Sequence, residues 1–101
     1  MAEILIVEDD RAIIRGLETN LTFEGHSVRA VTRGDEAEAA IAAARPDLLV
    51  LDVMLPGLSG FEICRRVRGA DRHLPILMLT ARGEAVDKAM GLDLRADDYL
   101  T

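Results

Sequence analysis

Three short runs of consecutive apolar residues constrain the fold of this chain more than any other feature. They cover residues 4–7, 48–51 and 76–79. A strand with one face in water alternates apolar and polar residues, whereas a strand covered on both faces reads as a continuous apolar run. Each of these runs is therefore predicted to be a buried strand of a parallel sheet.

Helix-like segments separate the runs, so strands and helices alternate along the whole chain. The predicted strands are 3–7, 27–31, 48–52, 76–80 and 97–100, and the predicted helices are 11–24, 35–44, about 60–68 and about 84–94. Asp10 and Ser59 are placed to cap the first and third helices. Such alternation implies right-handed crossovers and helices on both faces of the sheet, so the predicted fold class is α/β, doubly wound.

Length, charge and cysteine content exclude several classes of protein. The chain has 101 residues, enough for one domain, and its formal net charge of −6 leaves no basic surface for nucleic acid or anionic lipid. No stretch approaches the roughly 18 apolar residues of a membrane helix, and the N-terminus has no signal-peptide pattern. The single cysteine, Cys64, cannot form an internal disulfide. We therefore expect a cytoplasmic protein that does not bind a membrane.

Polar side chains follow each of the three apolar runs. Glu8, Asp9 and Asp10 follow the first run, Asp52 the second and Thr80 the third. Ligands of doubly wound sheets bind outside the carboxyl ends of the strands, so these groups are expected to share one site. Crowded carboxylates repel one another unless they bind a proton or a cation, and an all-oxygen ligand set favours Mg²⁺. A carboxylate beside such an ion could receive a phosphoryl group.

Four motifs, in order along the chain, resemble the receiver domains of bacterial two-component response regulators. They occupy residues 7–10, 51–57, 79–81 and 96–99. The resemblance extends over the whole chain, residues 1–101, and is greatest to the OmpR/PhoB-like subfamily. It implies a single receiver domain with a flavodoxin-like five-stranded parallel sheet in the strand order 2-1-3-4-5.

The resemblance also implies a role for each residue of the acidic site. Asp52 would be the phosphoacceptor, receiving its phosphoryl group from a sensor histidine kinase. Glu8, Asp9 and Asp52 would hold Mg²⁺ together with the backbone carbonyl of Met54, with Asp9 nearer the ion and Glu8 acting through water. The chain would not be an enzyme in its own right, but a signalling domain that assists only its own phosphotransfer and dephosphorylation.

A second group of residues is implied to carry the switch. Thr80 would move toward the phosphoryl group, Ala81 would leave room for that group, and Tyr99 would turn inward in concert. The face formed by the fourth helix and fifth strand would then change shape and relay the signal.

The resemblance further implies partners and a segment beyond the last residue. A downstream output domain would regulate transcription by binding DNA, whereas residues 1–101 would not bind nucleic acid directly. A lysine, a proline and a fifth helix would follow Thr101. Without them we expect impaired phosphorylation, and either instability or self-association through the uncovered sheet or the fourth-helix/fifth-strand face.

Other interpretations of the same residues remain open. The acids at 8–10 could simply cap the first helix and complement its dipole. A hydrolase with an aspartyl-phosphate intermediate would typically carry an acid where Met54 stands. A flavin- or nucleotide-binding module would need a phosphate loop rich in glycine or hydroxyl groups after the first strand, in place of three acids. The strongest alternative is a receiver-like interaction module that acts without phosphorylation.

Overall fold

The computed structural model describes residues 1–79 and the backbone of residues 98–100, and these residues form an α/β fold. In chain order the elements are β1 (Glu3–Val7), α1 (Arg11–Phe23), β2 (Ser27–Val31), the short 3₁₀ helix η1 (Gly34–Glu36), α2 (Ala37–Ala43), β3 (Leu48–Asp52), α3 (Gly60–Ala70), β4 (Ile76–Leu79) and β5 (Asp98–Leu100). The predicted helix at about 84–94 lies outside the described residues.

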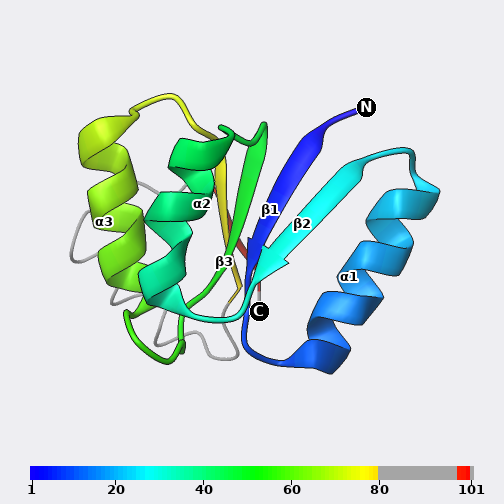
Figure 1. Ribbon diagram of the computed structural model, residues 1–101, viewed down its shortest axis with the longest axis horizontal. Helices are drawn as coiled ribbons and strands as arrows, with labels where there is room; N and C mark the ends of the chain where they lie inside the picture. The colour runs from blue at the N-terminus through cyan, green and yellow to red at the C-terminus, as the bar shows by residue number, and fades with distance from the viewer. Residues whose placement is uncertain (80–97, 101) are drawn as a thin grey trace.

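The strands form one parallel sheet in the order β2-β1-β3-β4-β5. β1 is paired on both sides, with Ile4 opposite Val28 of β2 and opposite Leu48 of β3. Figure 1 shows α1 on one face of the sheet and α2 with α3 on the other. The predicted doubly wound sheet and its strand order are therefore confirmed.

The continuous apolar runs are explained by two hydrophobic cores, one on each face of the sheet. Along β1, Leu5 and Val7 point into the core beneath α2 and α3, whereas Ile4 and Ile6 point into the core beneath α1. All four side chains are buried. Complete burial of a side chain of this size contributes roughly 1.5–3 kcal/mol, so both faces of β1 favour the sheet.

Both predicted helix caps are present. Oδ1 of Asp10 accepts hydrogen bonds from the backbone N–H groups of Ala12 at 2.9 Å and Ile13 at 3.4 Å. Oγ of Ser59 accepts one from the N–H of Glu62 at 3.3 Å. These side chains satisfy amide donors that have no partner within the helix, and so define where α1 and α3 begin.

The second helix is shorter than predicted. The helix predicted over 35–44 begins instead with the 3₁₀ turn η1, and α2 itself has only seven residues, with Ala44 as its C-cap. Arg29 of β2 reaches over the end of α2 and donates hydrogen bonds to the carbonyl oxygens of Ala40 and Ala44. A side chain from another element thus caps this short helix, an arrangement that helical periodicity does not reveal.

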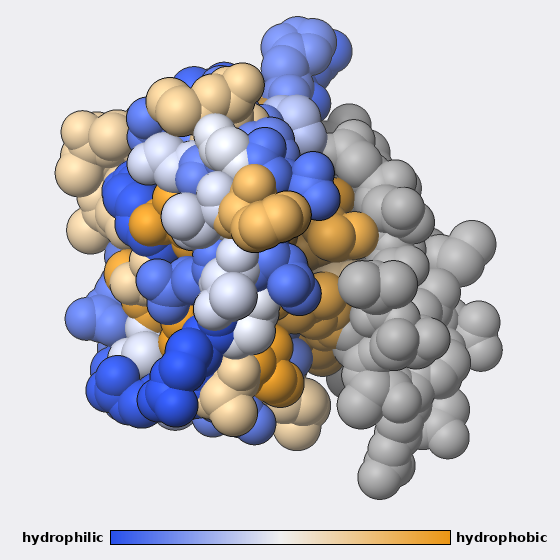
Figure 2. Space-filling view, turned by 90° about the vertical axis from the view of Figure 1, so that its right-hand side faces the viewer, coloured by the Kyte–Doolittle hydropathy of each residue, from blue (hydrophilic) through white to orange (hydrophobic). Residues whose placement is uncertain are grey.

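The outer face of α1 mixes polar and apolar side chains, as Figure 2 shows from that side. Ile13 and Phe23 on this helix are the large apolar residues most exposed there, at 43% and 89%. Within the described part of the chain, no helix is long and apolar enough to cross a membrane.

Candidate functional site

The carboxyl ends of β1 and β3 bring three acidic side chains together. Val7 is paired with Leu51, so the residues that follow them emerge at the same edge of the sheet. Carboxylate oxygens of Glu8, Asp9 and Asp52 all lie within 4.8 Å of one another. In the sheet, β2 lies on one side of β1 and β3 lies on the other side. The cluster at the ends of β1 and β3 therefore occupies the point where the strand order reverses.

Burial perturbs two of these carboxyl groups. Glu8 is only 2% exposed, and its removal from water raises the pKa of its carboxyl from 4.5 to about 7. An N–H donated by Asp10 at 3.0 Å opposes this rise, and the nearby charge of Asp52 adds to it. Desolvation also raises the pKa of Asp52, although the hydrogen bond from Glu8 lowers it. Both carboxyl groups therefore hold a proton more readily than they would in water.

The segment after Asp52 is anchored beside the cluster. The backbone N–H of Met54 donates to Oδ1 of Asp52 at 3.4 Å, while the Met54 side chain is 79% exposed. The neighbouring Val53 donates its N–H to the carbonyl of Leu79 at 3.1 Å and accepts from the N–H of Gly60 at 3.0 Å. The backbone of Met54 is thus held close to the acidic side chains.

The residues present fit a hard divalent cation. Their ligand atoms are oxygens, they come from three carboxyl groups, and Asp9 is exposed at the open side of the cluster. Because desolvation raises the pKa values of Glu8 and Asp52, a bound dication would stabilise the charged forms that this environment disfavours. Mg²⁺ suits one or two carboxylates with retained waters better than a soft metal would.

The acids at 8–10 divide their roles. Asp10 caps α1, as the purely structural interpretation expected, but Glu8 and Asp9 lie with Asp52 in the cluster. Helix capping therefore accounts for one of the three acids.

The remaining predicted site residues lie wholly or partly outside the described part of the chain. Thr80 and Ala81 are not described, although Leu79, which precedes them, is paired with Asp52. The backbone of Tyr99 lies in β5 opposite Met78, and its side chain is outside the described residues.

One residue of the site was missed by sequence reasoning. Gly60, the first residue of α3, packs so closely on β3 that a Cβ there would lie 2.2 Å from the carbonyl oxygen of Asp52. Any other residue would push α3 away from the end of β3. The only available signal was a glycine directly after the Ser59 cap.

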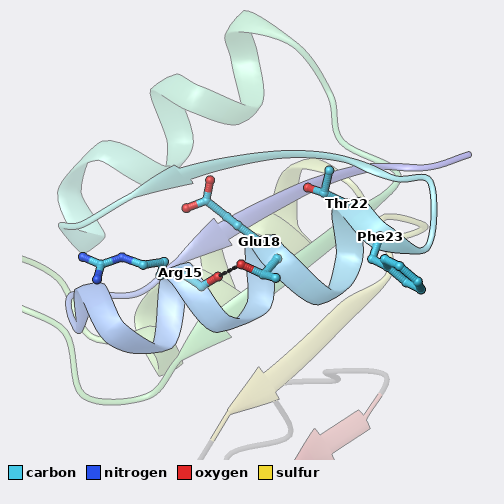
Figure 3. A pocket seen from close by; sticks show the side chains of 5 residues that line it. Arg15, Glu18, Thr22 and Phe23 are labelled. Carbon is cyan, nitrogen blue, oxygen red and sulfur yellow. Dashed lines mark hydrogen bonds between the residues drawn. The ribbon is translucent and has the colours of Figure 1, made fainter.

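A hollow on the outside of α1 offers a different kind of surface. It is lined by Arg15, Glu18, Thr19, Thr22 and Phe23, all from this one helix (Figure 3). The Thr19 hydroxyl donates to the Arg15 carbonyl at 2.8 Å. With a single carboxylate, this surface has no ligand set comparable to the acidic cluster.

The fold and the cluster together define a class of protein: an α/β domain with an acidic site where β1 and β3 diverge at the carboxyl edge of a parallel sheet. The family model described as the response regulator receiver domain matches residues 4–101. The chain therefore belongs to the receiver domain family.

Individual relatives agree with this assignment and confirm the resemblance to OmpR/PhoB-like receivers. The chain is 49% identical over 100 residues to the transcriptional regulatory protein AfsQ1 of Streptomyces coelicolor, covering 99% of this chain and 44% of that protein. It is 53% identical over 97 residues to the response regulator MprA of Mycobacterium tuberculosis, covering 96% of this chain and 42% of that protein. The chain thus spans less than half the length of the curated relatives it matches.

Solved structures share the fold closely. The BeF₃-activated N-terminal receiver domain of RstA from Klebsiella pneumoniae superposes with a TM-score of 0.87 at 37% identity, covering 96% of this chain and 82% of that one. The response regulator TrrA from Thermotoga maritima, in complex with Mg²⁺ and BeF, gives a TM-score of 0.89 at 30% identity, covering 100% of this chain and 86% of that one.

Proposed function

We propose that this chain is a phosphorylation-activated signalling switch in which Asp52 accepts a phosphoryl group from a sensor histidine kinase in the presence of Mg²⁺. The observation that carries the proposal is the cluster of Glu8, Asp9 and Asp52 at the switch point of the sheet, in a member of the receiver family. Two solved relatives support it, because the RstA receiver domain is in a BeF₃-activated form and TrrA is in complex with Mg²⁺ and BeF.

The proposed chemistry requires an ionised Asp52. A carboxylate oxygen of Asp52 attacks the phosphorus of a phosphohistidine, an acyl phosphate P–O bond forms, and the P–N bond breaks as the imidazole leaves. Although desolvation raises the pKa of Asp52, the hydrogen bond from Glu8 lowers it and so favours the ionised, nucleophilic form of that carboxyl. The N–H of Met54 donates to Oδ1 and orients the carboxylate. Asp9, Asp52, Glu8 and the Met54 carbonyl would hold Mg²⁺, which when bound would neutralise charge on the carboxylates and the phosphoryl oxygens.

The switch itself is proposed for the residues after β4 and in β5. Thr80 contacts the phosphoryl group, Ala81 leaves it space, and Tyr99 changes position with it. Two backbone features support this arrangement: Leu79 is paired with Asp52, and Tyr99 is paired with Met78 of the same β4 strand. The proposed output is transcription regulation, in keeping with the relative AfsQ1, a transcriptional regulatory protein. We further infer a DNA-binding output domain and a cytoplasmic location. The expected self-association stays a prediction.

The experiment is phosphoryl transfer from a small acyl phosphate donor, followed by intact-mass spectrometry. With Mg²⁺ we expect the mass gain of one phosphoryl group, lost on chelation and lost in Asp52→Asn. The matched control is Asp10→Asn, which keeps the helix cap and lies outside the cluster. Unchanged phosphorylation of Asp52→Asn would refute the assignment. Because residues 1–101 alone are expected to be impaired in phosphorylation, the chain extended past Thr101 is tested in parallel. Folded protein of that length that takes up no phosphoryl group would favour the interaction module instead.

A further inference from the structure

The connection that follows β2 lies against the connection that follows β3 at the carboxyl edge of the sheet (Figure 1). The backbone N–H of Gly34 donates to the carbonyl of Pro56 at 3.0 Å. A Cβ on Gly34 would lie 1.8 Å from the carbonyl oxygen of Leu58 and 2.7 Å from its carbonyl carbon. Since neither atom belongs to a flexible side chain, residues 56–58 rest directly on the backbone of Gly34.

An ion pair flanks this contact. The guanidinium of Arg33 donates from Nε and Nη2 to the two carboxylate oxygens of Asp35, each at 3.0 Å. Gly57 lies against this pair, because a Cβ there would be 2.9 Å from both Arg33 Nη2 and Asp35 Cγ. Gly57 has a φ of +88°, a backbone conformation that suits glycine. The ion pair therefore fills the space beside the turn at Pro56-Gly57.

Other contacts hold both ends of the same loop. Val53 is bound to the backbone of β4 and of α3, and Gly60 packs on the carbonyl of Asp52. Met54, whose N–H binds the Asp52 carboxylate, lies between the anchor at Val53 and the anchor at Pro56. The position of its backbone consequently depends on both anchors.

We propose that Arg33, Gly34 and Asp35 form a brace of positioning residues that fixes the Met54 backbone for the site around Asp52. The inference rests on the proposed function, in which the Met54 carbonyl is a ligand of Mg²⁺. A surface ion pair ordinarily contributes little to stability. In the brace, the ion pair has a role other than stabilising the fold. It fixes the geometry of the loop after β3, and β3 lies two strands away from β2 in the sheet.

The test measures Mg²⁺ affinity by titrating the amide signals of the ¹⁵N-labelled whole protein. Arg33→Gln and Asp35→Asn are each expected to weaken Mg²⁺ binding at least threefold and to move the Met54 and Gly57 amide signals even without metal. The double variant should be no weaker than either single variant, because the pair acts as a unit. If the charge of each residue acted alone, the two variants would change Mg²⁺ affinity in opposite directions. Removing the positive charge of Arg33 would strengthen Mg²⁺ binding, and removing the negative charge of Asp35 would weaken it. Opposite signs, or additive losses, would overturn the brace.

The matched control is the ion pair between Arg66 and Glu38, which has the same 3.0 Å separation and the same exposure of about half. It joins α3 to α2, whereas the Arg33–Asp35 pair packs against Gly57 of the loop after β3, so Glu38→Gln is expected to leave Mg²⁺ affinity unchanged. Equal effects of Glu38→Gln and Asp35→Asn would also overturn the proposal.

A glycine variant adds a second, stronger perturbation. Gly34→Ala should displace the Leu58 carbonyl and weaken Mg²⁺ binding at least tenfold, whereas Gly16→Ala, with nothing within 4 Å of the added carbon, should not. If Gly34→Ala does not fold, the ion-pair variants decide alone. If the proposed function itself is wrong, the result is different: the wild-type protein then binds no Mg²⁺ or accepts no phosphoryl group at Asp52. A brace that fails by itself leaves both properties intact and Arg33→Gln indistinguishable from wild type.

Discussion

Replacing Glu8 by glutamine is expected to remove a pH-dependent loss of stability in the metal-free protein. Burial raises the pKa of Glu8 from 4.5 to about 7. Between these values the unfolded chain ionises this carboxyl while the folded protein keeps its proton. The free energy of unfolding is thus highest below the lower value, falls as pH rises, and has lost the full contribution once pH exceeds the folded pKa.

The size of the effect follows from that interval. Each tenfold change in proton affinity corresponds to about 1.4 kcal/mol, so wild-type protein should lose about 2 to 3 kcal/mol through Glu8 between about pH 5 and about pH 8. The glutamine side chain cannot ionise, and its amide keeps a hydrogen-bond donor beside Asp52. The difference in unfolding free energy between Glu8→Gln and wild type should therefore grow by this amount over the same range, in favour of the variant.

The assay is urea unfolding with a chelator present, at several pH values, using circular dichroism. Glu38→Gln is the control, because Glu38 is a half-exposed acid on α2, outside the cluster. It should change the pH dependence much less. Parallel pH profiles of unfolding free energy for wild type and Glu8→Gln would refute the reasoning. They would mean that the pKa of Glu8 is the same in the folded and the unfolded protein.

Three further outcomes follow from the same contacts. The apparent affinity for Mg²⁺ should rise with pH up to about 7 and then level off, because the cation displaces the proton on Glu8. Calorimetry in buffers of different ionisation enthalpy should detect the release of this proton. An affinity that does not change with pH would contradict the prediction. Asp10→Ala should cost about 1 kcal/mol in urea unfolding through loss of the α1 cap, whereas Asp10→Asn should cost far less. Gly60→Ala should destabilise the protein by about 1–3 kcal/mol and weaken Mg²⁺ binding, because the new Cβ would meet the Asp52 carbonyl. The control is Gly69→Ala in the same helix, where the new carbon has open space around it. Equal effects of the two substitutions would contradict the packing argument.

Sequence reasoning succeeded where a pattern is local. The strands at 3–7, 27–31 and 48–52 have the predicted bounds. In β1 and β3 this is because the two cores on either face of the sheet demand apolar residues at consecutive positions. Arg29, which interrupts the apolar pattern of the second strand, does lie on an edge strand. The approach of Glu8 and Asp52 followed from the rule that parallel strands end at one edge.

Features that depend on contacts between distant segments could not be predicted. The near-complete burial of Glu8 depends on what surrounds the end of β1, and no residue beside it in the sequence signals that. The cap at the C-terminal end of α2 depends on Arg29, which comes from another element. The contact of Gly34 with Leu58 is made through backbone atoms. Apart from the glycine itself, no residue type in the sequence indicates where those backbone atoms lie.

The separation of Glu8 and Asp52 on two different strands has a consequence for folding. Their carboxyl groups come together only when β1 and β3 pair, so an unfolded chain has no cluster to offer a cation. By mass action, any ion that binds the native cluster draws the population toward the folded state, by an amount set by its concentration relative to its dissociation constant. The level of such an ion around the protein would then help to decide how much of it is folded, before any signal arrives.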